Sequence, residues 1–246
     1  MVRTVDHGSR KDRVLAATVD SYVCQGEPVS SIELSSAFNL SSATIRNILA
    51  ELEAEGYLWH PHTSAGRVPS TKGYRYYVDF LMGGDELPEE EKTSIRGGYS
   101  QRSSSLDEIL EQTSDLLAEV THYASIVSFA DSQDRIFCKG LGNIIQQPEF
   151  HDFECFSPEV RLLEGRKKLL ELISQELDKP LKVYIGEEIG DPQIGQACSL
   201  VVSTYKRGKK DKGRIAVLGP CRMSYCKTLS ALEYVASLLN EMLEDL

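Results

Sequence analysis

The first part of the chain carries apolar positions at helical spacing, interrupted by short turns. Leu15, Val19 and Tyr22 recur three or four positions apart, which is typical of a helix packed on one side. Gly26 follows, and glycine readily adopts the left-handed conformation that closes many helices. The pattern therefore predicts a first helix over residues 11–25.

Two more helices are predicted next, with a tight turn between them. Ser30 begins an S-x-x-E capping box, which predicts a second, short helix that ends near Phe38. Asn39 tolerates the left-handed conformation of a tight turn, and Ser41 can cap a third helix that ends at Gly56. Two helices joined by three or four residues match a helix-turn-helix.

A hairpin and a fourth helix are predicted after the third helix. Residues 57–60 have the pattern of a strand, and residues 67–69 that of a return strand after the turn-rich sequence PHTSAG. Ser70 can cap the helix that follows. The hairpin would form a wing, so the sequence predicts a winged helix-turn-helix domain over residues 1–82.

The third helix begins with small polar side chains and is apolar on one side. A recognition helix packs an apolar face on its own domain while its first turn enters the major groove of DNA. Arg46 can reach guanine or a phosphate, Asn47 can pair with adenine, and first-turn N–H groups can hold a phosphate oxygen. The alternative is that Ser41 and Thr44 only begin a helix. The predicted DNA-binding residues are Ser41, Ser42, Thr44, Arg46, Asn47, His62, Arg67 and Lys72.

Charge changes this picture only in part. The net charge is −10, but residues 1–84 hold 8 Lys and Arg against 9 Asp and Glu, so the acidity belongs to the remainder. A nearly neutral head can still present a basic face if its cations cluster. Arg67 and Lys72 flank the return strand, and we expect them to contact phosphates or the minor groove. Solvated surface charge is the alternative.

The rest of the chain predicts a second domain. Gly83 and Gly84 open a linker over residues 83–104 that contains a short helix, and residues 105–246 form an α+β domain with a mixed sheet. Helices are predicted at 105–121, 158–177 and 224–246, and strands at 125–130, 136–139, 181–186, 197–207 and 213–219.

No pattern indicates catalysis, a metal or a cofactor. The six cysteines form no CxxC pair, and neither His60 with His62 nor His151 with Cys155 has a second ligand pair for zinc. No Ser/His/Asp set or phosphate-binding glycine motif is present. No apolar run approaches the ~18 residues of a membrane helix, and the first residues lack a secretory signal, so we expect a cytoplasmic protein that is not an enzyme.

The strings LSSATIRNILAELEAEGYL and PHTSAGRVPSTKGYRYYVD resemble the head of the HrcA family of heat-inducible transcription repressors. NIIQQPEFHDF, VYIGEE, CSLVVSTY and LGPCRMSY are similar to segments of that family's second domain. The resemblance implies a winged helix-turn-helix head and a GAF-like body. It also implies a dimer that binds an inverted-repeat operator, called CIRCE, upstream of chaperone operons, with the chaperonin GroE as a partner that keeps the repressor active.

One departure from the family concerns dimerisation. SIVSFA runs through DSQDR almost directly into IFCKGLGN, where family members carry a dimerising insert. We still expect a homodimer, held through the amphipathic helices at 105–121 and 224–246. The competing hypothesis is a cytoplasmic ligand-binding sensor whose winged helix contacts proteins. The polar first turn of the third helix favours DNA, because a protein-binding face would expose apolar residues there.

Overall fold

In the computed structural model the chain folds into two compact units. The first unit, the head, comprises Met1–Gly84 together with Cys221–Cys226, and the second, the body, comprises Asp85–Pro220 with Lys227–Leu246. Within them the structure describes residues 9–62, 65–84, 86–99, 105–129, 132–147, 166–174, 179–191, 197–207 and 210–244.

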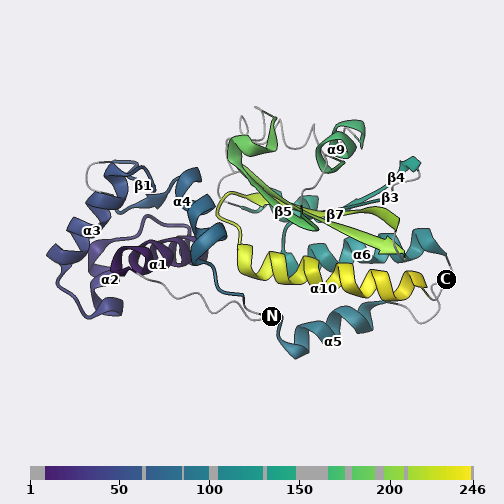
Figure 1. Cartoon of the computed structure of the whole chain (residues 1–246), viewed down its shortest axis with the longest axis horizontal. Helices are drawn as coiled ribbons and strands as arrows, with labels where there is room; N and C mark the ends of the chain where they lie inside the picture. Colours follow the sequence, from purple (N-terminus) through teal and green to yellow (C-terminus); the bar gives the residue numbers. More distant parts are fainter. Residues whose placement is uncertain are drawn as a thin grey trace. The chain divides into compact units, whose positions relative to one another are not determined.

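The three predicted helices of the head are confirmed. They are α1 (Arg10–Gln25), α2 (Ser31–Phe38) and α3 (Ser42–Ala54), shown in Figure 1. Gly26 and Asn39 adopt the left-handed conformation, with φ of 73° and 52°. The Ser30 hydroxyl accepts a hydrogen bond from the Glu33 N–H, which fixes the start of α2. The apolar stripes of the helices meet in a core that includes Val14, Leu15, Val19, Leu34, Ile45, Leu49 and Leu52.

The wing is a short antiparallel hairpin. Strands β1 (Leu58–Trp59) and β2 (Val68–Pro69) have two residues each, fewer than predicted. Arg67 extends the return side, because its backbone exchanges hydrogen bonds of 2.9 and 2.8 Å with Val29. The fourth helix follows as α4 (Thr71–Tyr76), capped by the Ser70 hydroxyl as predicted, and continues as the π-helix η1 (Tyr77–Leu81).

The body contains a five-stranded sheet in the order β4-β3-β7-β6-β5. The expectation of a mixed sheet was wrong, since all four neighbouring pairs are antiparallel. The reason is that β3 and β4, and likewise β6 and β7, are hairpins, while β7 returns antiparallel to β3. The strands are β3 (Ala124–Phe129), β4 (Ser132–Lys139), β5 (Leu181–Ile185), β6 (Cys198–Arg207) and β7 (Lys210–Pro220).

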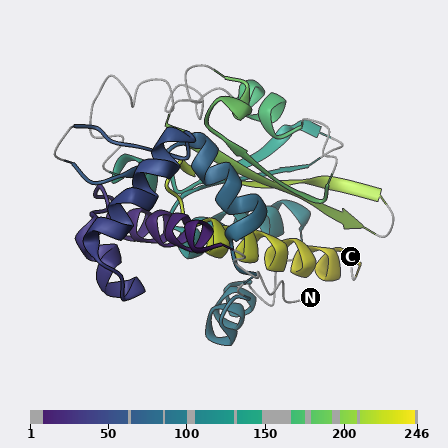
Figure 2. The same ribbon diagram turned by 60° about the vertical axis from the view of Figure 1, so that its left-hand side comes forward.

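Helices cover both faces of this sheet. Helices α6 (Leu106–Thr121) and α10 (Tyr225–Glu244) lie on one face, and α9 (Arg166–Ile173) lies on the other (Figures 1 and 2). The α9 face buries a cluster that includes Ile126, Ile136, Ile173, Leu200 and Leu218. The body is therefore an α+β unit with an apolar core on both sides of its sheet.

The body also contains shorter helices. They are α5 (Glu89–Gly98), α7 (Leu141–Ile145) and the 3-10 helix η3 (Gly186–Ile189), of which the last two were not predicted. The Tyr99 hydroxyl, just after α5, lies 2.9 Å from the Thr113 hydroxyl of α6. Of the helix predicted at 158–177, residues 158–165 and 175–177 lie outside the described residues, as do residues 148–153 of the string NIIQQPEFHDF.

Candidate nucleic-acid interface

The first turn of α3 is fixed by two of the predicted residues. The Ser41 hydroxyl accepts a hydrogen bond from the Thr44 N–H at 3.1 Å and lies 2.8 Å from the Thr44 hydroxyl. Both side chains therefore stabilise the start of the helix, which agrees with the alternative that Ser41 and Thr44 only begin a helix. The cap leaves the first-turn N–H groups directed along the helix axis, where they can attract an anion. Ser42 is half-buried beside them.

The outward face of α3 carries two of the predicted DNA-binding residues, Arg46 and Asn47. Ala43, Arg46, Asn47 and Ala50 are exposed and have the spacing of one helical face, opposite the buried Ile45, Leu49 and Leu52. Neither the Arg46 nor the Asn47 side chain makes a hydrogen bond or ion pair with any residue that the structure describes. Their polar groups are therefore available to a ligand.

Sequence reasoning missed the two alanines on this face. Ala43 and Ala50 flank Arg46 and Asn47, and their small side chains let a partner surface approach the helix closely. Their positions three residues from Arg46 and Asn47 would have identified them, because residues three and four apart share one face of a helix. We add both alanines to the candidate interface.

The wing contributes an exposed tip. His62 is exposed in the turn between β1 and β2, and its carbonyl accepts a hydrogen bond of 2.9 Å from the Ala65 N–H. Trp59 of β1 is 48% exposed. The structure thus places His62 on the surface, as a contact with DNA requires.

Arg67 faces α3. Its guanidinium Nη2 lies 2.7 Å from Glu53 Oε2 near the end of α3, and its side chain is only 20% exposed. The other Glu53 oxygen contacts His60 Nδ1. Arg67 Nε is buried without a hydrogen-bond partner among the described residues. The predicted phosphate contact would therefore compete with an ion pair inside the head.

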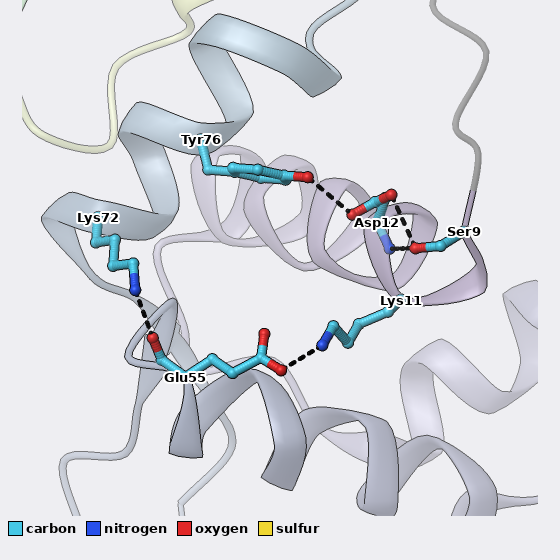
Figure 3. Close-up of polar contacts among 6 residues, drawn as sticks. All are labelled: Ser9, Lys11, Asp12, Glu55, Lys72 and Tyr76. Carbon is cyan, nitrogen blue, oxygen red and sulfur yellow. Dashed lines mark hydrogen bonds and ion pairs between the residues drawn. The ribbon is translucent and has the colours of Figure 1, made fainter.

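Lys72 also has partners inside the head (Figure 3). Its ammonium donates a 2.8 Å hydrogen bond to the Glu55 carbonyl and lies 4.5 Å from the centre of the Tyr57 ring. The Glu55 carboxylate in turn pairs with Lys11 of α1 at 2.5 Å, and this hydrogen bond raises the pKa of Lys11. Lys72 remains exposed, but its charge already stabilises the end of α3.

A second contact in the same region joins α4 to α1. The Tyr76 hydroxyl donates a 3.3 Å hydrogen bond to Asp12, which also accepts one from the Ser9 hydroxyl (Figure 3). Burial, and then the Asp12 carboxylate, raise the pKa of Tyr76. These links fix α1, α3 and α4 against one another, so the outward face of α3 stands on a rigid base.

Other kinds of site find no support in the part of the chain that the structure describes. Its histidines, cysteines and carboxylates form no group of three or more that could hold a metal ion. Among the same residues, no helix has both the length and the apolar character that crossing a membrane requires.

The head has the three features that define a winged helix-turn-helix unit: a tight turn before α3, an outward polar face on α3 and a hairpin wing behind it. Comparisons with known proteins show which family the chain resembles. Residues 128–229 match the family described as "HrcA protein C terminal domain".

Curated relatives match over nearly the whole chain. The heat-inducible transcription repressors HrcA of Desulforamulus reducens and Pelotomaculum thermopropionicum are each 29% identical to it over 96% of both chains. The resemblance to HrcA repressors is therefore confirmed. Each alignment runs over 336 positions whereas this chain has 246 residues, so at least 90 positions of each relative have no counterpart here. That difference agrees with a missing insert.

A solved structure shares the fold. A protein described as hypothetical, in a crystal structure at 2.2 Å resolution, superposes with a TM-score of 0.76 over 96% of this chain and 98% of its own. The two sequences are 20% identical, so this likeness supports the fold alone.

Proposed function

We propose that this protein is a DNA-binding transcription repressor that reads an inverted-repeat operator of the CIRCE type upstream of chaperone operons. The observation that carries the proposal is the outward face of α3, where Arg46 and Asn47 are exposed and have no partner among the described residues. The names of the relatives, heat-inducible transcription repressors, support the same function.

In this proposal α3 enters the major groove with its first turn leading. Arg46 donates two hydrogen bonds to guanine O6 and N7, and Asn47 exchanges a donor and an acceptor with adenine N6 and N7. Ala43 and Ala50 allow the helix to approach the base edges and can contact thymine methyl groups. The first-turn N–H groups that the Ser41 hydroxyl does not cap hold a phosphate oxygen. Specificity then comes mainly from two side chains in each half-site.

The wing lies beside this groove in the proposed complex. His62 at its tip contacts the sugar-phosphate backbone or the minor groove, and Lys72 lies on the exposed side of α4. Lys72 can approach a phosphate while it keeps its hydrogen bond to the Glu55 carbonyl, because an ammonium has three donors.

Two heads act together in the proposal. An inverted repeat presents two half-sites related by a two-fold axis, so a homodimer places two recognition helices in matching symmetry. We propose that the body, an antiparallel sheet between helices, has the GAF-like arrangement and holds the dimer without the insert. The chaperonin GroE is the proposed partner that keeps the repressor active. The working place of such a repressor is the cytoplasm.

The test is a salt series of binding by the full chain to an inverted-repeat duplex, a single half-site and a scrambled duplex. We expect the operator to bind about a thousandfold or more tighter than the scrambled duplex. With about two phosphate contacts for each head, log K should fall against log salt with a slope of about −4. Equal affinity for operator and scrambled duplex at every salt concentration would refute the proposal.

Sedimentation of the free protein at micromolar concentration tests the dimer separately. A pre-formed dimer sediments at twice the 27.4 kDa mass of one chain. A single species at 27.4 kDa that pairs only when operator is added would contradict assembly through the body.

A further inference from the structure

We propose that Glu53 is a positioning residue that sets the angle between the wing and the recognition helix, an inference that rests on the proposed DNA-binding function. Glu53 lies near the end of α3 and is half-buried. Its Oε1 contacts His60 Nδ1, directly after β1, while its Oε2 lies 2.7 Å from Arg67 Nη2, directly before β2. One carboxylate therefore holds both sides of the wing against the helix that reads DNA.

The wing needs such a contact because its own ladder is short. The strands β1 and β2 have two residues each, and Pro69 has no N–H to donate. On the return side, Arg67 is tied by its backbone to Val29, and the Ser70 N–H donates to the Tyr57 carbonyl at 3.0 Å. On the outgoing side, His60 reaches α3 through its side chain. Just before β1 the Tyr57 N–H also donates to the Leu52 carbonyl of α3 at 2.9 Å, so Glu53 adds a side-chain link on the far side of β1.

The burial of Arg67 indicates how it acts. Its side chain is 20% exposed, and Nε is buried without a partner among the described residues, so the cation depends on the Glu53 carboxylate for compensation. If Glu53 loses its charge, the Arg67 guanidinium is left half-buried and unpaired, and it must move toward water. The backbone of Arg67 is part of the wing, so this movement displaces the wing. Arg67 therefore acts through Glu53 and not by a direct contact with a phosphate.

The experiment compares Glu53→Gln with Glu55→Gln in the full chain. Glu55 is a matched control because it lies two residues further on and pairs with a cation, Lys11, that belongs to α1 and not to the wing. Trp59, the single tryptophan of the chain, lies in β1 next to His60. Acrylamide quenching of its fluorescence therefore reports the position of the wing without any DNA.

We expect Glu53→Gln to raise the quenching constant by up to about twofold, because a side chain that is 48% exposed can at most about double its exposed area. Glu55→Gln should leave quenching unchanged. Circular dichroism checks that both variants keep the helical content of the full chain. Unchanged quenching in Glu53→Gln, or an equal rise in both variants, would overturn the proposal.

Arg67→Met separates positioning from a phosphate contact. If Arg67 acts through Glu53, Arg67→Met raises Trp59 quenching in the same direction as Glu53→Gln. The double variant shows no change beyond that of Glu53→Gln, since that change already breaks the ion pair with Arg67 and alters the contact with His60. Each variant should weaken operator binding about threefold to tenfold without changing the salt slope. A slope that becomes shallower by about one unit in Arg67→Met, with Trp59 unchanged, would show a phosphate contact and overturn the proposal.

The two readouts separate this inference from the proposed function. If the unaltered protein does not prefer the operator but Trp59 responds as expected, the DNA-binding function fails while the Glu53 contact stands. If the operator is preferred and Trp59 does not respond, the function stands and Glu53 has no positioning role.

Discussion

Replacing Arg46 by alanine removes the largest polar side chain from the outward face of α3 without disturbing the fold. The side chain is exposed and has no partner among the described residues, so no internal contact is lost. Alanine has a slightly higher helix propensity than arginine, so the free energy of unfolding should change by less than about 0.5 kcal/mol. Any loss of operator binding therefore reports on the interface.

The expected loss of operator affinity follows from the number of contacts between arginine and guanine. A bidentate pair between arginine and guanine contributes about 1 to 3 kcal/mol of discrimination in each half-site. Two heads on one inverted repeat double this to about 2 to 6 kcal/mol, which is a rise in Kd of roughly 30-fold to 20,000-fold. Binding to a scrambled duplex should change far less, because only the charge of Arg46 contributes there.

Arg46→Lys is the matched control, and fluorescence anisotropy with operator and scrambled duplexes is the assay. Lysine keeps the positive charge but lacks the planar pair of donors that fits one guanine, so it should restore binding to scrambled DNA and not the preference for the operator. Full recovery of operator preference by lysine, or equal losses on both duplexes in Arg46→Ala, would refute base reading by Arg46.

Two further predictions concern the framework. Gly73→Ala in α4 should destabilise the head by about 2 to 4 kcal/mol in a denaturant titration, because the added Cβ would lie 2.1 Å from the Tyr57 carbonyl oxygen. Gly97→Ala in α5 should instead stabilise the fold by about 0.5 to 1 kcal/mol, because outside its own helix no atom of the described residues lies within 4 Å of the added Cβ. Burial raises the pKa of Tyr99 to about 12. The stability that the neutral hydroxyl contributes is therefore complete below the unfolded pKa of about 10 and is lost as the pH rises from 10 to 12. Tyr99→Phe should reduce the slope of unfolding free energy against pH in this range by up to about 1.4 kcal/mol per pH unit, and an unchanged slope would contradict the assignment.

Local chemistry made the head predictable from the sequence. Gly26, Asn39, Ser41 and Ser70 end or begin helices through contacts within four residues, so their roles follow from residue type and spacing. The outward face of α3 followed in the same way from the position of its apolar stripe. The length of the wing did not follow, because its return side pairs with Val29, a residue far away in the sequence.

Contacts between residues far apart in the sequence could not be predicted from local sequence patterns. Arg67 pairs with Glu53, 14 residues earlier, and Lys72 donates to the Glu55 carbonyl, 17 residues earlier. A cationic side chain looks the same in the sequence whether it faces DNA or a carboxylate. The antiparallel sheet was missed for a related reason, since β3 pairs with β7, and Phe129 lies opposite Gly213, far away in the sequence.

These internal partners change how the head would recognise DNA. Arg67 pairs with Glu53, Lys11 with Glu55 and Arg75 with Asp79, so several cations of the head are already compensated inside it. Few charges then remain to release counterions from DNA, and the acidic remainder of the chain, with 28 Asp and Glu against 19 Lys and Arg after residue 84, adds repulsion. We therefore expect such a head to bind random DNA weakly. Its affinity for an operator must come mostly from base contacts at α3, which makes the geometry of that helix more important than the net charge.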